Sequence, residues 1–147
     1  MPNDARLYFV LALVAITLVA GVYYRATRGR AKAVAEGIRV DLKEIKAIKD
    51  GKPFESFDRK ITFLQFSSQY CTQCPQTARL LGEIEQSDHN VRHLEVDITE
   101  RLDLAQKYHV LQTPTTLVLD RRGNVKRRIG GAPKAQTLEN EIGTFDI

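Results

Sequence analysis

One stretch decides how this chain folds: residues 61–75 read ITFLQFSSQYCTQCP. Its first six residues are mostly apolar and β-favouring, and small polar residues, two cysteines and a helical pattern follow. Cysteines three positions apart at the start of a helix share one turn, so we expect Cys71 to be exposed and Cys74 to lie beneath it. The unpaired N–H groups at a helix N-terminus stabilise a thiolate, which lowers the thiol pKa from a free value of about 8.5. This arrangement favours thiol–disulfide exchange.

The two cysteines are the only ones among the 147 residues, so none is left for a structural disulfide elsewhere. A metal site is a second interpretation, because Cys-x-x-Cys supplies two thiolates. Tetrahedral zinc needs four ligands, however, and the chain has no second Cys-x-x-Cys. His89, His93 and His109 could complete such a site only if folding brought them to the cysteines. We therefore predict catalytic cysteines and no metal, and an incidental buried pair is the remaining alternative.

The charge distribution argues against a nucleic-acid partner. The chain carries 22 Lys and Arg against 18 Asp and Glu, a net charge of +4, and 43% of its residues are hydrophobic. Four cations between residues 25 and 32 account for the whole excess, because the charges before and after them cancel. A nucleic-acid-binding domain would instead show a basic face on its folded part. A chain of this length has room for one domain plus an appendage.

Residues 7–24 read LYFVLALVAITLVAGVYY, a run without a charge. As a helix they would extend roughly 27 Å, close to the thickness of the hydrocarbon core of a bilayer. Tyrosines at both ends of the run suit the two membrane interfaces. We predict an uncleaved membrane anchor. The alternatives are a buried core helix and a cleaved signal peptide, whose first region would be poorly basic because Asp4 offsets Arg6.

Flanking charges predict the orientation of this anchor, because Lys and Arg near a membrane span favour the cytoplasmic side. Only Arg6 and the amino terminus precede the span, whereas four cations follow it, namely Arg25, Arg28, Arg30 and Lys32. We expect a single-pass protein of the cell membrane with its domain in the cytoplasm, and the extracytoplasmic orientation is the alternative. The expected divisions are an N-terminal tail and transmembrane anchor over residues 1–24, a basic juxtamembrane linker over 25–37 that continues the helix or forms a stalk, and a domain over 38–147.

The pattern after residue 37 predicts an α/β domain. Ile38 and Val40 could form an edge strand, and Leu42, Ile45 and Ile48 have the spacing of a helix face that turn residues end at 50–53. Further on, a helical crossover between two strands implies parallel pairing, and a Gly-centred turn makes the last two strands a hairpin. Helices must cover both faces of such a sheet. The expected elements, in the order β-α-β-α-β-β-α, are Ile61–Phe66, Pro75–Gln86, Val91–Asp97, Leu102–Tyr108, Thr115–Leu119, Val125–Ile129 and Lys134–Thr144.

Over roughly residues 38–145 these features together resemble the thioredoxin family. The resemblance rests on the strand–CxxC–helix at 63–81, the strand that ends in Asp97, the Thr113-Pro114-Thr115 tripeptide, the hairpin, and two glycines before the last helix. It implies a thioredoxin-like fold, a central mixed sheet flanked by helices, here preceded by one N-terminal transmembrane helix. It also implies that Pro114 is a cis-proline facing a redox-active Cys71–Cys74 disulfide, and that the backbone of Thr113 is free to pair with an extended substrate segment. The resemblance implies no cofactor besides the disulfide.

The chain departs from the family pattern around the cysteines. Tyr70 replaces the Trp that normally precedes the first cysteine, and Thr72-Gln73 stand where a reducing thioredoxin has Gly-Pro. Gln65 stands where a buried acid is expected, and His93 where the lysine partner of that acid is expected. Because glutamine cannot accept a proton, any help in deprotonating the second cysteine must come from water or His93. His93 could equally be an ordinary strand residue, and Tyr70 could be either a platform beside the disulfide or part of the core.

The expected function is that of an enzyme: a membrane-tethered thiol–disulfide oxidoreductase that acts on protein partners as a protein-disulfide reductase. We expect partners that are themselves associated with the membrane, because tethering raises their effective concentration. The alternative from a different class is a non-catalytic adaptor or metal-carrying module with the same fold. An outward-facing domain would act as an oxidant, or would need electrons that another protein carries across the membrane.

Overall fold

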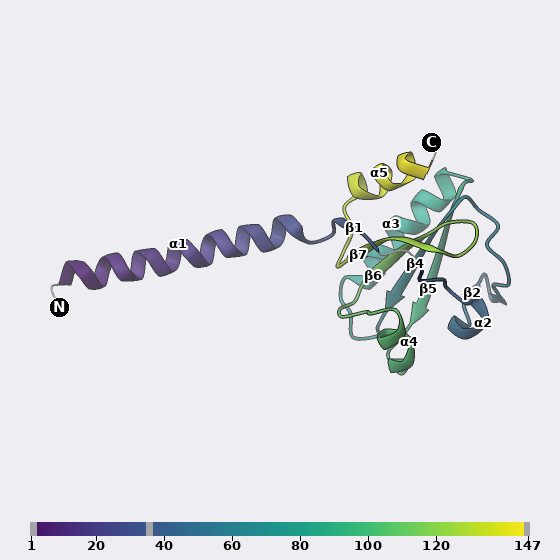
Figure 1. The fold of residues 1–147 in the computed structure, drawn as a ribbon, viewed down its shortest axis with the longest axis horizontal. Coiled ribbons are helices and arrows are strands. Elements are labelled where there is room, and N and C mark those ends of the chain that lie inside the picture. Colours follow the sequence, from purple (N-terminus) through teal and green to yellow (C-terminus); the bar gives the residue numbers. More distant parts are fainter. Residues whose placement is uncertain (1–2, 35–36, 146–147) are drawn as a thin grey trace.

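A five-stranded mixed sheet forms the centre of the domain, with the strand order β1-β7-β6-β4-β5 (Figure 1). The computed structural model describes residues 3–34 and 37–145. Strand β4 pairs in parallel with the edge strand β5, and the other neighbouring strands are antiparallel. The strands are β1 (Ala31–Ala33), β4 (Ile61–Ser67), β5 (Val91–Asp97), β6 (Thr115–Leu119) and β7 (Val125–Gly130).

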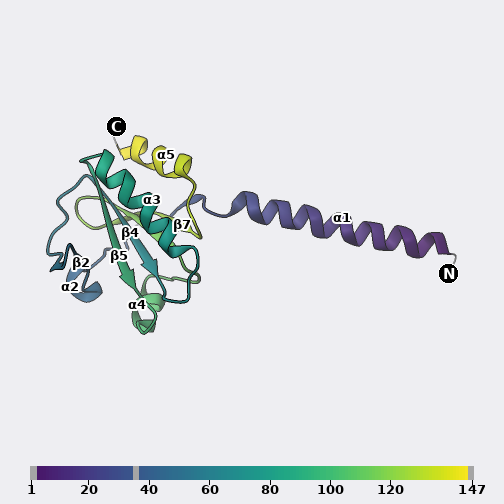
Figure 2. The ribbon, with the colours of Figure 1, turned by 180° about the vertical axis from the view of Figure 1, so that it is seen from behind.

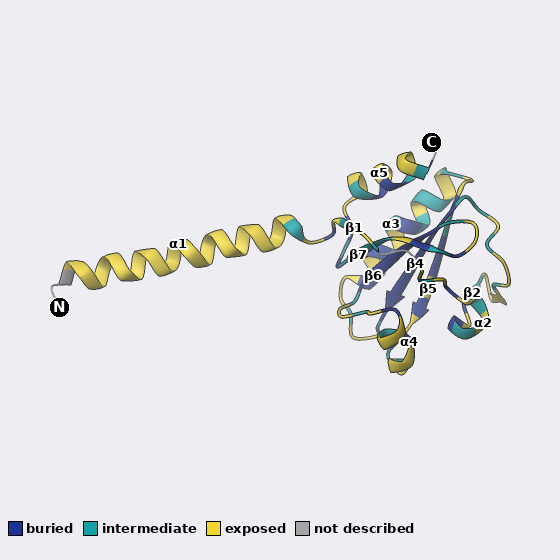
Figure 3. Ribbon diagram, viewed as in Figure 1, coloured by how far each residue is buried: buried dark blue, intermediate teal, exposed yellow. Residues whose placement is uncertain are grey.

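Helices cover both faces of this sheet and bury strand β4. On one face, α3 (Cys74–Ser87) and α5 (Ala135–Phe145) pack onto the sheet through buried residues such as Leu81 and Leu138 (Figure 2). On the other face, α2 (Leu42–Ile45) and α4 (Leu102–Lys107) enclose a second cluster. Its largest side chains include Phe66 and Tyr108, whose rings stack with centroids 5.6 Å apart. Every residue of β4 is buried, so this strand lies in the core between the two layers of helices (Figure 3).

The expected order of elements after residue 60 is confirmed, and so is the parallel pairing across the helical crossover. Helix α3 begins at Cys74, one residue before the expected start, and α4 ends at Lys107. Strand β6 has the expected bounds, and β7 and α5 each end one residue later than expected. The spacing of apolar residues therefore predicted the ends of each of these helices and strands to within a residue or two.

The expected continuation of the helix beyond residue 24 is confirmed only as far as Thr27, and residues 28–34 form neither a helix nor a stalk. Helix α1 (Asn3–Thr27) ends just before Gly29, whose φ of 72° turns the chain. The N–H of Gly29 then donates to the carbonyl oxygen of Gly130 over 3.0 Å, and Ala31–Ala33 pair with β7 as strand β1. The physical reason is that β7 offers an open edge, which no local pattern in three residues can reveal. Ala35 and Glu36 lie outside the described residues, and the division into residues 1–24, 25–37 and 38–147 stays a prediction.

The segment before β4 also differs from the expectation. Between Ile38 and Val40 the structure has one isolated antiparallel bridge, from Arg39 to Asn124, in place of an edge strand. Helix α2 ends at Ile45 because Lys46 adopts a left-handed φ of 48°. Ile48 is therefore exposed rather than on a helix face, and it lies in β2 (Ile48–Lys49), which forms a small hairpin with β3 (Lys52–Pro53).

Helix α1 projects away from the domain and is exposed along nearly its whole length (Figure 3). Within the part of the chain that the structure describes, it is the one helix long and apolar enough to cross a membrane. A signal sequence near an N-terminus has the same length and composition. The structure thus contains an apolar helix that is long enough to span a membrane, while its insertion, its retention and its orientation remain predictions.

Candidate active site

The two cysteines lie at the junction between the end of β4 and the start of α3. The N–H of Cys71 donates to the carbonyl oxygen of Ser68 over 3.0 Å, which closes the turn between the two elements. Cys71 is partly exposed, Cys74 is 3% exposed, and their sulfur atoms are bonded to each other, with the Cα atoms 5.5 Å apart. The expected arrangement of one accessible sulfur above one enclosed sulfur is therefore present. Cys71 precedes the first turn of α3 rather than belonging to it, because the helix begins at Cys74.

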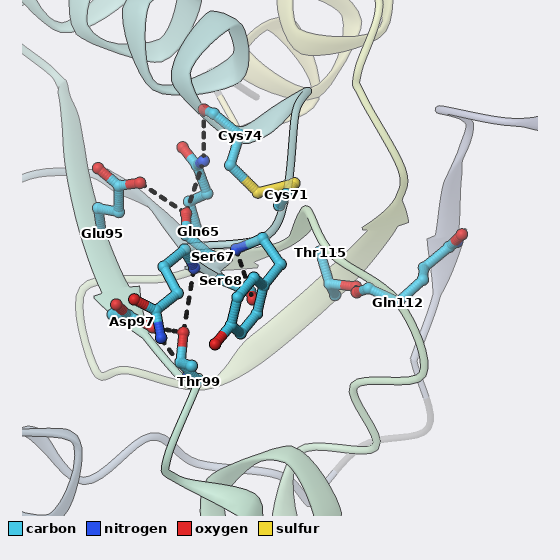
Figure 4. Close-up of a disulfide and its surroundings, with 12 residues drawn as sticks. Gln65, Ser67, Ser68, Cys71, Cys74, Glu95, Asp97, Thr99, Gln112 and Thr115 are labelled. Atoms are coloured by element: carbon cyan, nitrogen blue, oxygen red, sulfur yellow. Dashed lines mark hydrogen bonds between the residues drawn. A yellow bond between two sulfur atoms is a disulfide. The ribbon is translucent and has the colours of Figure 1, made fainter.

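Gln65 connects the inner cysteine to the neighbouring strand (Figure 4). Its side-chain nitrogen donates to the carbonyl oxygen of Cys74 and to the hydroxyl oxygen of Ser67, each over 3.0 Å. Its side-chain oxygen lies 3.0 Å from Nε2 of His93. Since both amide hydrogens of Gln65 are used as donors, His93 must donate its Nε2–H to the remaining oxygen. All the polar atoms of this fully buried amide are therefore satisfied, and the amide fixes the position of the first turn of α3.

His93 is a neutral imidazole in this network. Burial, together with the nearby Lys49, lowers the pKa of His93 from its ordinary 6.5 to about 4, and Glu85 acts in the opposite direction. Its hydrogen bond runs to Gln65, which lies between the imidazole and the cysteine carbonyl. His93 can therefore influence Cys74 only through the glutamine, and its lowered pKa makes it a poor acceptor for the thiol proton.

Two residues that the sequence reasoning missed, Ser67 and Glu95, also reach this site. The hydroxyl of Ser67 donates to Oε1 of Glu95 over 2.6 Å. Both residues line a hollow of about 610 Å³ that also contains Cys71 and Cys74. A signal for Glu95 existed: residues two apart on a strand share a face, so Glu95 lies on the same face as His93 and directly beside Gln65 in the parallel register.

A second surface begins at Tyr70, the residue that precedes Cys71. The peptide bond between Thr113 and Pro114 is cis, and the hydroxyl of Thr115 donates to the carbonyl oxygen of Gln112 over 2.6 Å. Thr113 makes no backbone hydrogen bond to any described residue. Tyr70 and Thr113 line one hollow of about 270 Å³, in which Tyr70 is 83% exposed and Leu111 is 96% exposed. Tyr70 is thus not a core residue, and the remaining prediction is that it acts as a platform.

Comparison with known proteins agrees with this geometry. A family model described as Thioredoxin matches residues 46–144, which is most of the chain beyond α1. The chain belongs to the thioredoxin family. It is 27% identical to the thioredoxin of Mycoplasma pneumoniae over 97 residues, which is 65% of this chain and 93% of that protein. It is 29% identical to thioredoxin H5 of Oryza sativa over 72 residues, 49% of this chain, and spans only 53% of that relative.

Solved thioredoxin structures have the same fold. The thioredoxin NaTrxh from Nicotiana alata superposes with a TM-score of 0.52 at 26% identity, covering 61% of this chain and 77% of that one. Mitochondrial thioredoxin 3 from Saccharomyces cerevisiae gives a TM-score of 0.52 at 22% identity, over 70% of this chain and 85% of that one. The family and the Cys71–Cys74 pair make this thioredoxin-family protein a thiol–disulfide oxidoreductase. Within residues 3–34 and 37–145, no three His, Cys, Asp or Glu side chains gather where they could hold a metal ion.

Proposed function

We propose that this protein is a membrane-tethered protein-disulfide reductase whose domain faces the cytoplasm. The observation that carries the proposal is the accessible Cys71 bonded to the enclosed Cys74, preceded by Tyr70, whose exposed ring lines a hollow with the exposed Leu111. An exposed aromatic side chain adjoining a reactive cysteine, with an exposed leucine in the same hollow, suits an unfolded or extended protein segment as substrate. The unpaired backbone of Thr113 supplies hydrogen bonds for that segment.

Reduction of a partner proceeds through one mixed disulfide. In the dithiol form, Cys71 attacks a disulfide of the partner as a thiolate, and the departing partner sulfur takes up a proton. Cys74 then loses its proton and attacks the sulfur of Cys71, which releases the second partner sulfur as a thiol. Two electrons pass from the cysteine pair to the partner, and the intramolecular disulfide is restored.

Glu95 is the proposed destination of the proton that Cys74 must lose. Gln65 cannot accept a proton, and His93 contacts Gln65 rather than Cys74 and is a weak base because of its lowered pKa. Glu95 carries the carboxylate that hydrogen-bonds to Ser67, and it lines the same hollow as the cysteine. Water in that hollow would connect the thiol to the carboxylate, so Glu95 takes the role that neither Gln65 nor His93 can fill.

Membrane tethering is proposed from α1 and its flanking charge. The helix is apolar and exposed, and Arg25, Arg28, Arg30 and Lys32 follow it, which favours a cytoplasmic domain. Tethering confines the enzyme to two dimensions, so the preferred partners are proteins of the same membrane. A reporter joined after Ile147 that is active on only one side of the membrane tests this orientation, and activity on the outer side would contradict it.

The reductase mechanism is tested by trapping its covalent intermediate. Cys74→Ser removes the attacking sulfur of the second step, so the full-length variant should accumulate mixed disulfides with membrane proteins that dithiothreitol cleaves. Cys71→Ser is the matched control, because it retains the buried thiol but has no accessible nucleophile and should trap nothing. Equal trapping by both variants, or none by either, would refute the assignment. Turnover of insulin reduction by the unmodified protein separates an enzyme from a non-catalytic module.

A further inference from the structure

The junction between α1 and the domain contains a basic hollow that thiol exchange does not use. It has a volume of about 290 Å³ and lies where the end of α1 meets strands β1 and β7. Tyr24 and Thr27 line it from the helix, and Gln112 lines it from the loop before Pro114. Four cations also line it, namely Arg28, Arg30, Lys32 and Arg128, and no carboxylate of the described residues does.

None of the four cations forms an ion pair with a described residue, so no carboxylate there neutralises them. Arg128 is half-buried and donates to the carbonyl oxygens of His109 and Tyr108 over 2.7 and 2.6 Å. Arg28 donates to the side-chain oxygen of Gln112 over 3.3 Å, and its guanidinium lies 5.0 Å from the centre of the Tyr24 ring. These partners are neutral, so they orient the guanidinium groups without cancelling their charge. By contrast, Arg92 in the domain is paired with two carboxylates.

We propose that this hollow binds the phosphate of an anionic phospholipid from the membrane that α1 spans. Several oriented guanidinium and ammonium groups in one hollow match a phosphate, which accepts paired N–H bonds from arginine. The lipid is favoured over a soluble anion because Tyr24 and Thr27 belong to the last turns of α1, and a spanning helix ends at headgroup depth. The inference rests on the proposed membrane anchoring of the chain.

Lipid binding here would also position the active site. Gln112 accepts from Arg28 on one side, and its carbonyl accepts from Thr115 next to the cis-proline on the other. Figure 4 shows Gln112 and Thr115 on the opposite side of the disulfide from Glu95. A headgroup in the hollow would therefore hold the Thr113–Pro114 loop against the membrane surface. Partner disulfides close to the bilayer would be presented to Cys71 in preference to distant ones.

Native mass spectrometry of the full-length protein in detergent tests the proposal with dioleoylphosphatidylglycerol and dioleoylphosphatidylcholine as probes. We expect the dissociation constant of the first bound phosphatidylglycerol molecule to be at least about tenfold lower than that of the first bound phosphatidylcholine molecule. The variant Arg28→Gln with Arg30→Gln should lose most of that preference; both side chains are exposed, so the fold should tolerate the change. The control, Arg121→Gln with Arg122→Gln, removes the same charge from residues that line a different hollow and should keep the preference.

Equal lipid preference in the two variants would overturn the proposal. Displacement of the lipid by an equal concentration of inorganic phosphate would overturn it as well, because the site would then serve a soluble anion. Insulin reduction by the unmodified protein is measured separately, because a lack of turnover would overturn the proposed enzyme without bearing on the lipid preference. Recovery of the mature protein from cells without α1 would overturn both the anchoring and the lipid site, whereas a membrane-bound protein without lipid preference overturns only the latter.

Discussion

His93 should make the stability of this protein fall as the pH is lowered from 8 to 5, and one substitution should remove that effect. The imidazole is only 7% exposed and donates to Gln65. Burial and Lys49 of β2 lower the pKa of His93 from 6.5 to about 4, against the opposing effect of Glu85 of α3. In the unfolded chain the imidazole takes up a proton at its ordinary pKa. The unfolded state therefore binds more protons in this range, and stability is lost as the pH falls through it.

The size of the effect follows from the two pKa values of His93. The difference between 6.5 and about 4 corresponds to about 3 kcal/mol over the whole range, of which about 2 kcal/mol is lost between pH 8 and pH 5. The side chain is nearly enclosed, so solvent screening reduces this figure little. Asp58 and Glu85 also have lowered pKa values, but their contributions are lost below their ordinary values of 3.8 and 4.5, outside the chosen range.

Urea unfolding of the full-length oxidised protein in detergent, followed by circular dichroism at pH 8 and pH 5, measures this loss. His93→Gln is the matched control, because glutamine can still donate an N–H to Gln65 but does not titrate. The variant should lose about 2 kcal/mol less than the unmodified protein between the two pH values. The other histidines and the carboxylates are common to both proteins, so their effects cancel in the comparison.

Two results would refute this reasoning. Parallel stability curves for the two proteins would mean that His93 has the same pKa in the folded and unfolded states. A direct titration of His93 by nuclear magnetic resonance that gave an ordinary pKa in the native protein would mean that the imidazole is solvated. Either result would also remove the argument that His93 is a neutral donor to Gln65.

Three further predictions concern the active site and the core. Glu95→Gln should slow the resolution of the mixed disulfide roughly 10²-fold at neutral pH. Asp97→Asn, a change in the same hollow, should not slow it. Equal rates for the two variants in stopped-flow kinetics would exclude the Glu95 carboxylate as the proton acceptor. Phe66→Ala removes a fully buried ring that stacks on Tyr108 and should cost about 3–5 kcal/mol of unfolding free energy; an unfolding midpoint within error of the unmodified protein would contradict this packing. Tyr70→Ser should raise KM for protein disulfides several-fold without changing the rate with a small aromatic disulfide, and a parallel loss with both would place Tyr70 in the chemistry rather than in docking.

Much of the fold could be predicted because its signals are local. Ile61–Phe66 reads as a strand and the residues after Cys74 read as a helix, since burial imposes periods of two and of about 3.6 residues. The Gly-centred turn before Val125 marks a hairpin for the same kind of reason. Strand β1 carries no such signal, because three small or polar residues form a strand only where another strand leaves an edge open. Its existence depended on β7, almost a hundred residues further along the chain.

The site likewise has a part that consecutive residues predict and a part that only folding brings together. Two cysteines at a strand-to-helix junction and an apolar run of membrane length are properties of consecutive residues, so the sequence by itself determined the class of chemistry and the candidate anchor. Only the tertiary structure brought Ser67 and Glu95 together beside the inner sulfur, and Arg28 and Arg128 together at the end of α1. The physical reason is that proton transfer and anion binding act over a few ångströms, and the sheet register and the turn at Gly29 decide which distant side chains come that close.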